Sequence, residues 1–156
     1  MALLNIRKNG DPVLRKKSRP VEVINDRIIT LLDDMHETLK LAQGLGLAAP
    51  QVGVLRRVVI IELDGRLYEM INPEIVETKG YQEEIEACLS VPDLYGLVRR
   101  PAWVKIKALD RYGKEYFAEG TGLLARAFSH ETDHLDGILY IDKAKKTYTP
   151  DEVEEV

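Results

Sequence analysis

The sequence predicts an α+β fold, in which a mostly antiparallel β-sheet packs around a central helix that carries the motif His-Glu-x-x-His. An amphipathic helix is predicted near the N-terminus. Two segments have the apolar periodicity of helices, one in each half of the 156-residue chain. Between them lie alternating and β-branched segments joined by turn residues, the pattern of successive strands. Because the sheet-forming segments lie between two helices, the α+β class follows.

The first third of the chain is predicted to be extended chain followed by a helix. Residues 9–22 are polar, include two prolines and favour extended chain with turns. The first helix is predicted from Asn25, with Gly44 ending it. Its buried face follows from apolar residues spaced by three or four positions: Ile28, Leu32, Met35, Leu39 and Ala42. The next stretch, GLGLAAPQVG, is too rich in small residues to be a packed element and unusually apolar for a loop.

Two hairpins are predicted next. In the first, the segments VVIIEL (58–63) and LYEMI (67–71) flank Asp64-Gly65, a dipeptide that favours a tight turn because glycine accepts positive φ. In the second, the residues of WVKIKALD alternate in polarity as a half-buried strand does. That strand, its turn and its partner are WVKIKALD (103–110), RYGK (111–114) and EYFAEG (115–120).

A second helix is predicted to begin near Thr121, whose hydroxyl would cap it, and to end at about Gly137. The acidic residues 147–156 are predicted to be a short, partly mobile tail with one helical turn. Neither an internal repeat nor a low-complexity linker divides the sequence. Residues 1–156 are therefore predicted to form a single domain.

Composition limits the partners and the compartment. Apolar residues make up 45% of the chain and charged residues 31%, as in ordinary globular proteins. A net charge of -4 gives no electrostatic reason to expect nucleic acid or an anionic membrane as a partner. No apolar run approaches the roughly 18 residues of a membrane span, and the first residues lack the pattern of a signal peptide. Since the lone cysteine, Cys88, allows no internal disulfide, we expect a cytoplasmic protein.

The second predicted helix carries a candidate metal-binding pair. His130 and His134 are separated by about 40° around a helix axis, so their imidazoles can meet one ion. Leu123 and Ala127 share their stripe, and imidazoles on an apolar face need partners such as a metal. Glu131 is about 100° from His130, beside the ion, where a general base for a metal-activated water belongs. The bare motif also occurs by chance, with histidines of the core or the surface.

Two histidines leave a metal site in need of a third ligand and an open position. Cys88 is a candidate, because a thiolate is a strong, soft ligand for zinc or ferrous iron. A lone cysteine is also compatible with a small buried hydrophobic residue or with a nucleophile.

Three segments together resemble the peptide deformylase family. They are GLGLAAPQ (44–51), EACLS (86–90) and SHETDHLDG (129–137), which follow the family patterns GxGLAAPQ, EGCLS and QHExDHLxG in order. DPVLRKKSRPV (11–21) and the VKIKALDRYGK hairpin (104–114) also resemble the family. The likeness therefore covers nearly the whole chain.

The resemblance implies a metal-dependent hydrolase that removes the N-formyl group from the formyl-methionine of newly synthesised peptides and releases formate. It implies that Cys88, His130 and His134 bind the metal and that Glu131 acts as acid and base. Ferrous iron is the expected ion, with zinc, nickel or cobalt as substitutes. The expected partners are N-formylmethionyl nascent peptides, with transient association with the ribosome.

The resemblance also implies the groups that stabilise and bind the substrate. The side chain of Gln51 and the backbone N–H of Leu89 would hold the developing oxyanion. Preorganised donors of this type contribute roughly 3 kcal/mol each. An extended peptide would pair like an added strand with backbone groups at Leu45, Gly46 and Ala87, with Tyr95 near the cleft.

The sequence departs from the family pattern at two positions. Ala87 stands where the family usually has glycine, and its Cβ is expected to narrow the cleft or restrict the strand that enters Cys88. Ser129 stands where glutamine is usual, and its shorter side chain loses a hydrogen bond that could support the site. By resemblance, Glu86 is expected to pair with Arg100.

Two alternatives stay open from the sequence. One is an endopeptidase of the His-Glu-x-x-His type, although a cysteine ligand and a short chain without a second lobe argue against it. The other is a catalytically weak paralogue, a metal-stabilised binding module, which the changes at Ala87 and Ser129 bring into consideration.

Overall fold

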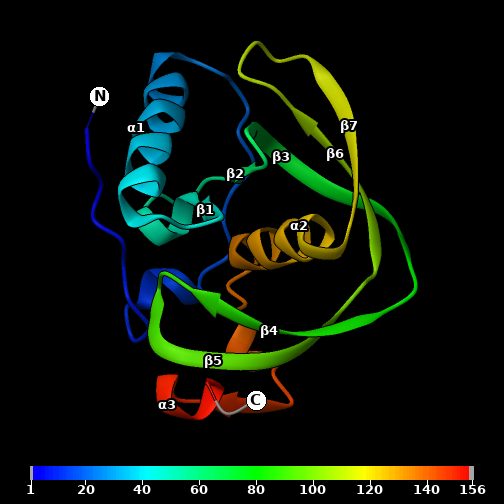
Figure 1. Ribbon diagram of the computed structural model, residues 1–156. Coiled ribbons are helices and arrows are strands. Elements are labelled where there is room, and N and C mark those ends of the chain that lie inside the picture. Colours follow the sequence, from blue (N-terminus) through cyan, green and yellow to red (C-terminus); the bar gives the residue numbers. More distant parts are fainter. Residues whose placement is uncertain (1, 155–156) are drawn as a thin grey trace.

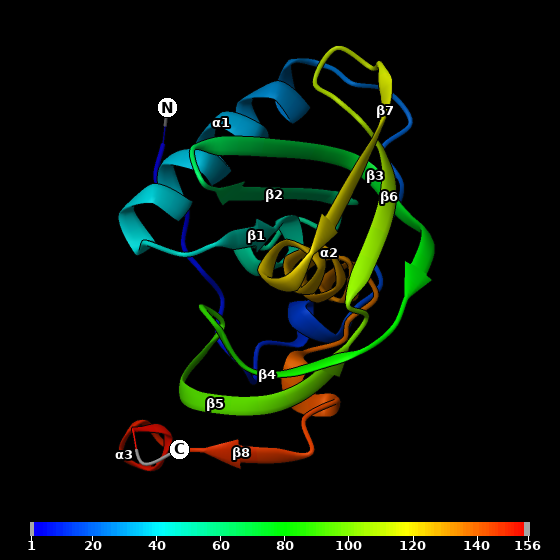
Figure 2. The same cartoon turned by 45° about the vertical axis from the view of Figure 1, so that its right-hand side comes forward.

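A central helix lies between two antiparallel sheets in the computed structural model, which describes residues 2–154. Figures 1 and 2 show this helix, α2, enclosed by the two sheets, with α1 on the outer side of β1 and β2. The larger sheet has the order β1-β2-β3-β6-β7 and the smaller one β4-β5-β8. The predicted α+β class with a mostly antiparallel sheet is confirmed.

The bounds of the elements are as follows. The strands are β1 (Gly46–Ala48), β2 (Val58–Leu63), β3 (Arg66–Lys79), β4 (Gln82–Cys88), β5 (Val91–Arg100), β6 (Trp103–Leu109), β7 (Glu115–Thr121) and β8 (Lys146–Tyr148). The α-helices are α1 (Asp26–Ala42), α2 (Gly122–Leu135) and α3 (Pro150–Val153). Short 3-10 helices are η1 (Pro12–Arg15), η2 (Ala49–Val52) and η3 (Tyr140–Asp142).

Both predicted hairpins form. Asp64 and Gly65 connect β2 to β3 with φ values of 53° and 78°, the left-handed geometry that a tight hairpin turn requires. The strand predicted at 67–71 is only the first part of β3, which continues to Lys79. The pairing of β3 with β6 shifts register after Ile71, where Asn72 has a φ of 52°. This irregularity interrupts the alternation and explains why the second half of the strand was not predicted.

Helix α1 begins as predicted, since the Asn25 side chain accepts a hydrogen bond from the Ile28 N–H at 3.2 Å. The helix ends just before Gly44, whose N–H donates to the carbonyl oxygen of Leu39 at 3.3 Å, but the left-handed C-cap position is occupied by Gln43, with a φ of 56°. Gly44 has a different role. A Cβ built on it would lie 2.7 Å from Cδ1 of Leu89, so the absence of a side chain leaves room for Leu89.

Helix α2 follows β7 without a gap. Thr121 is its N-cap residue, but the Thr121 side chain makes no capping hydrogen bond, so that part of the prediction was wrong. At the other end the chain turns at Gly137, with a φ of 75°. A Cβ there would lie 2.5 Å from the carbonyl oxygen of Arg15. The end of α2 therefore lies directly against the N-terminal segment.

The core holds α2 in place. Phe128 of α2 is fully buried and meets Tyr68 of β3 edge to face, with ring centroids 5.8 Å apart. It belongs to a cluster with Met70 and Ile106 on the inner face of the larger sheet. A second cluster packs α1, including Leu32, against the opposite side of β1 and β2. Since both faces of β2 are covered, its VVIIEL sequence is apolar throughout its first four residues.

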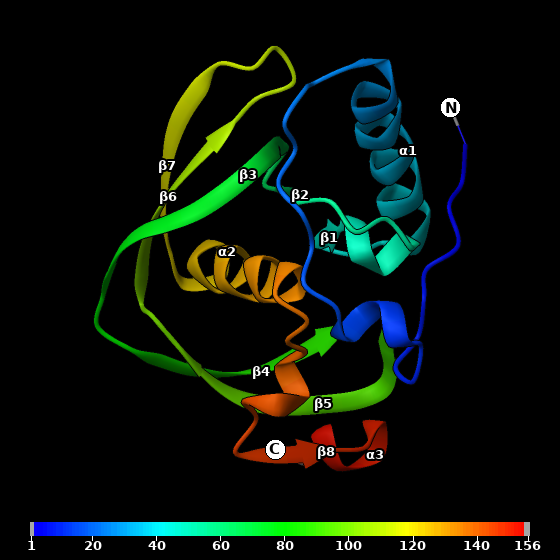
Figure 3. The same ribbon diagram turned by 180° about the vertical axis from the view of Figure 1, so that it is seen from behind.

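The last described residues form a strand that was not predicted, followed by one helical turn. Lys146–Tyr148 is β8, which pairs with β5, and Tyr148 lies opposite Tyr95. Figure 3 shows β8 and α3 below β5, and the N-terminal segment passing outside α1 toward η1. None of the helices within residues 2–154 has both the length and the apolar content that a bilayer span requires.

Candidate metal centre and active site

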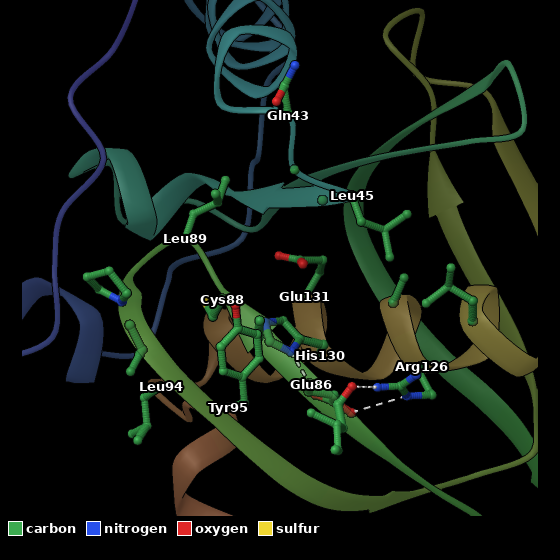
Figure 4. Close-up of a pocket in the computed structure, with 18 of the residues that line it drawn as sticks. Gln43, Leu45, Glu86, Cys88, Leu89, Leu94, Tyr95, Arg126, His130 and Glu131 are labelled. Atoms are coloured by element: carbon green, nitrogen blue, oxygen red, sulfur yellow. Dashed lines mark hydrogen bonds and ion pairs between the residues drawn. The ribbon is translucent and has the colours of Figure 1, made fainter. Parts of the chain in front are cut away.

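Cys88, His130 and His134 come together although the cysteine and the first histidine are 42 positions apart in the sequence. One potential ligand atom from each lies within 4.8 Å of the others. Cys88 Sγ is 3.4 Å from Nε2 of His134. Figure 4 shows Cys88 entering the site from the end of β4, and His130 and Glu131 rising from α2. Both histidines are more than nine-tenths buried.

The local structure of β4 and β5 presents Cys88 to the helix. The pairing of these strands shifts register between Glu86 and Cys88, and Cys88 then lies opposite Val91 across a tight turn. Leu89 and Ser90 form that turn, so the backbone of Leu89 follows the cysteine directly at the edge of the site. The segment EACLS thus places a thiol and a backbone amide at one corner.

A carboxylate behind His130 fixes the orientation of its ring. Nδ1 of His130 lies 2.8 Å from Oε1 of Glu86, which leaves Nε2 to face Cys88 and His134. Glu86 in turn accepts two hydrogen bonds from Arg100, at 2.9 Å and 3.0 Å. The pair expected from the sequence is therefore formed, with both side chains at least 95% buried. A carboxylate partner of this kind orients a histidine ligand and raises its basicity.

Arg100 also binds Asp133, a residue that the sequence reasoning missed. Its Nη1 donates to Oδ2 of Asp133 at 2.6 Å, so one guanidinium joins β4 and β5 to α2. The available signal was the position of Asp133, one residue before His134 on the motif helix. Through Arg100, the side chain of Asp133 belongs to the hydrogen-bond network that also holds His130, but residue spacing alone does not identify a partner 33 positions away.

The charges of these groups follow from their surroundings. Burial would raise the pKa of Glu86, but hydrogen bonds from His130 and Arg100 outweigh it and lower that pKa to about 2. Burial, with the positive charges of His130 and Arg100, lowers the pKa of His134 well below its usual value. His134 is therefore neutral, the form in which an imidazole binds a metal.

The donor set of the site fits a metal cation. Burial would lower the pKa of His130, yet its contacts with Cys88 and Glu86 outweigh burial and raise the pKa to about 10. One sulfur and two nitrogen donors, buried and converging, suit zinc or ferrous iron. The residues present fit a divalent transition metal.

Glu131 lies beside the three candidate ligands. Its Oε1 is buried and has no hydrogen-bond partner among the described residues. Burial raises the pKa of Glu131 to about 7. Gly46 of β1 makes room for this carboxylate, because a Cβ at Gly46 would lie 2.8 Å from Oε2 of Glu131. A buried carboxyl group with a pKa near neutrality is suited to exchanging protons.

Gln51 is fixed next to Cys88 by its neighbours. Its Oε1 accepts a hydrogen bond from the Ala48 N–H at 2.9 Å, and its Nε2 donates to Oγ of Ser90 at 3.0 Å. The same Nε2 faces Cys88 Sγ at 3.6 Å. Gln51 is only 1% exposed, so the loop that looked too apolar for a surface turn is in fact interior.

A cavity of about 410 Å³ opens beside Glu131. It is lined by the residues predicted to contact substrate, namely Leu45, Gly46, Ala87 and Tyr95, and by Cys88, Leu89, His130 and Glu131. Its wall also includes Arg126, which was not predicted. Arg126 donates to the backbone oxygen of Ile85 at 2.8 Å. It lies four residues before His130 on α2, and that spacing was the signal that could have identified it.

The two departures from the family pattern have different surroundings. Ala87 is exposed at the cavity rim and does not adopt a positive φ, so its backbone needs no glycine. Ser129 is buried, and its Oγ has no hydrogen-bond partner among residues 2–154. Neither residue displaces a candidate ligand.

Comparisons with known proteins agree with this geometry. The sequence model of the family described as Polypeptide deformylase matches residues 3–149. A peptide deformylase of Acetivibrio thermocellus is 56% identical over 154 residues, which cover 99% of this chain and 91% of that protein. The chain belongs to the peptide deformylase family.

Solved structures of deformylases give the same result. A peptide deformylase from Legionella pneumophila is 41% identical in sequence to this chain, and its crystal structure matches with a TM-score of 0.89. The match covers 99% of this chain and 90% of the Legionella chain. The Thermotoga maritima peptide deformylase is 36% identical, and its crystal structure matches with a TM-score of 0.90, covering 94% of this chain and all of that one.

The resemblance on which the functional expectation rested is therefore confirmed. The chain is a metal-dependent hydrolase that removes the N-formyl group of N-formylmethionyl nascent peptides and releases formate. The comparisons support deformylation and not the endopeptidase or the binding module that the sequence left open.

The buried position of Arg100 generates a prediction about stability. Arg100→Met removes the guanidinium that Glu86 and Asp133 share and leaves the buried Glu86 carboxylate without its bidentate partner, and we expect it to lower the free energy of unfolding by about 3–5 kcal/mol. Arg111→Met is the matched control, because Arg111 also joins two carboxylates, Glu69 and Asp33, but is 26% exposed. The control is expected to cost about 1 kcal/mol or less. Denaturant unfolding of both variants measures the difference, and equal losses would contradict the dependence on burial.

Proposed function

We propose that Cys88, His130 and His134 hold the catalytic metal of this deformylase and that Glu131 is its proton-transfer group. One observation carries the proposal: one sulfur and two nitrogen donors lie within 4.8 Å of one another, beside a buried carboxylate oxygen of Glu131 that has no hydrogen-bond partner among residues 2–154. A divalent ion held there would supply Lewis acidity, which polarises the formyl carbonyl and makes a nearby water molecule more acidic.

Glu131 then moves one proton twice. As a carboxylate it accepts a proton from the water that attacks the formyl carbon. It subsequently gives that proton to the amine nitrogen as the C–N bond breaks, so that formate and a free N-terminus are released. Burial, which raises the pKa of Glu131 to about 7, makes both directions of transfer accessible near neutral pH.

We propose that Gln51 and Leu89 hold the formyl oxygen while negative charge develops on it. The amide of Gln51 is oriented before substrate arrives, since its oxygen is bonded to Ala48 and its nitrogen to Ser90. The backbone of Leu89 lies next to Cys88 in the β4–β5 turn. Donors that need no reorganisation are the effective ones for such a charge.

The cavity suits the peptide that carries the formyl group. We propose that backbone groups of Leu45, Gly46 and Ala87 pair with the extended chain as an added strand, because they lie at the facing ends of β1 and β4. Tyr95 lines the rim where later residues of the peptide would lie. The apolar side chains of Leu45, Leu123 and Ala127 line the wall, an environment that accepts a methionine side chain.

We further propose that ferrous iron is the ion used in the cell, with zinc, nickel or cobalt as substitutes, since a thiolate and two imidazoles accept all four. Residues 1–156 would act as one catalytic domain, with 147–156 a short and partly mobile tail. We also propose transient association with the ribosome and a cytoplasmic location, because the substrates are nascent chains.

The role of Glu131 is tested by Glu131→Gln. This variant is expected to retain its metal, because no ligand is changed, and to lose at least about 100-fold in kcat/KM, because no group takes the proton. Glu37→Gln is the matched control. Like Glu131, Glu37 lies between a histidine and a threonine (residues 36–38), but it is on α1, near Lys40. Formate release and metal content are measured for both. Full activity of Glu131→Gln would contradict the assignment.

The identity of the ion is tested by purification without oxygen. We expect one iron per chain, and activity that falls in air as the ferrous ion and its thiolate ligand oxidise. Elemental analysis and formate release are followed on the same sample, and activity should return when nickel or cobalt is added to the metal-free protein. Zinc as the only metal, with iron-loaded protein no more active than zinc-loaded protein, would contradict the proposal.

A further inference from the structure

Three successive residues near the N-terminus bond to the two segments that carry the proposed oxyanion donors. The Arg7 N–H donates to the carbonyl oxygen of Gln51 at 2.7 Å, and the Asn9 N–H donates to that of Ser90 at 2.7 Å. Between them, Nζ of Lys8 donates to the carbonyl oxygen of Leu89 at 3.1 Å. Residues 7–9, which we call the N-terminal clamp, thus contact both η2 and the β4–β5 turn.

The N-terminal clamp is itself fixed in place. Asp11 follows it, and the Asp11 N–H donates to the carbonyl oxygen of Lys8 at 3.0 Å. The Asp11 carboxylate accepts from the Val13 N–H at 3.1 Å and pairs with Arg7 at 3.1 Å. Further along, the Ser18 N–H donates to the carbonyl oxygen of Leu135 at the end of α2. The same N-terminal segment therefore touches all three motif segments of the chain.

Leu89 is restrained on its other side by packing. Its Cδ1 occupies the space that Gly44 leaves, next to Leu39 at the end of α1. With the side chain held there and the carbonyl oxygen held by Lys8, the peptide planes on either side of Leu89 have little freedom to rotate. The direction of the Leu89 N–H depends on those planes, and displacements of about 1 Å at such a donor are costly in rate.

We propose that Lys8 is a positioning residue for deformylation, which orients the backbone of Leu89 through its carbonyl oxygen. This inference rests on the proposed function, in which the Leu89 N–H and Gln51 hold the formyl oxygen. Arg7 and Asn9 bond to the two segments through their backbone N–H groups, whereas Lys8 bonds to Leu89 through its side chain. A hydrogen bond donated by a cation is stronger than one between neutral groups. Lys8 is neither a candidate ligand nor one of the residues that line the cavity.

The test compares four variants of the full-length, metal-loaded protein: Lys8→Met, Lys8→Arg, Lys17→Met and Gln51→Ala. Lys8→Met is expected to lower kcat about fivefold with KM unchanged, because the bond orients a donor used in the transition state. Lys8→Arg keeps a cationic donor and should recover most of the rate. Lys17→Met removes another exposed lysine of the same segment and should have no effect. Kinetics are measured as formate release from a formyl-methionyl tripeptide.

A second readout is independent of catalysis. In the zinc-loaded protein, hydrogen exchange of the Leu89 and Ser90 amides, followed by NMR, should be faster in Lys8→Met and unchanged in Lys17→Met. Unchanged kcat and unchanged exchange in Lys8→Met, while Gln51→Ala is impaired, would overturn the role of Lys8 and leave the oxyanion proposal intact. If Gln51→Ala and Lys8→Met both retain full activity, the oxyanion assignment fails and this inference fails with it. An equal loss in Lys17→Met, or a change in KM alone, would also overturn it.

Discussion

The buried ion pair between Glu86 and Arg100 is the interaction on which the site depends. It lies where β4, β5 and α2 meet, and the same guanidinium reaches Asp133 on the motif helix. Glu86 also holds the ring of His130. An unpaired charge at this depth would be strongly destabilising, so the strands that carry Cys88 and the helix that carries the histidines have one low-energy arrangement. The geometry of the candidate ligands is thus set by the charged groups behind them.

The substrate side of the site is set by contacts of a different kind. Small residues between α1 and η2 allow close approach: Gly44 admits the side chain of Leu89, and Gly46 admits the carboxylate of Glu131. Hydrogen bonds then fix the polar groups, with Gln51 held by Ala48 and Ser90. At both positions glycine is needed because it has no side chain, and not for its backbone freedom, since neither residue has a positive φ. The proposed oxyanion donors and the proposed proton-transfer group are consequently in place before a peptide binds.

Much of this arrangement was accessible from the sequence, for identifiable reasons. The helix with His130 and His134 has a strong periodic pattern, and the turn Asp64-Gly65 has a specific geometry, so both were predicted. The convergence of Cys88 with the histidines was inferred only from resemblance, because no periodicity relates residues on different elements. Asp133, Arg126, β8 and the N-terminal clamp were missed. Their contacts join residues at least 33 positions apart or depend on a single strand pairing, and spacing along the chain does not report such contacts. For Arg126, the spacing of four residues before His130 could have indicated only the face of α2 on which it lies.

The central claim is that one sulfur and two imidazole nitrogens from two separate segments bind one ion. X-ray absorption at the metal edge of zinc-loaded protein in solution measures this directly. We expect one sulfur at about 2.3 Å and two nitrogens at about 2.0–2.1 Å from the zinc, and loss of the sulfur contribution in Cys88→Ser. A coordination sphere of nitrogen and oxygen alone, unchanged in Cys88→Ser, would contradict the convergence of Cys88, His130 and His134 on a single metal.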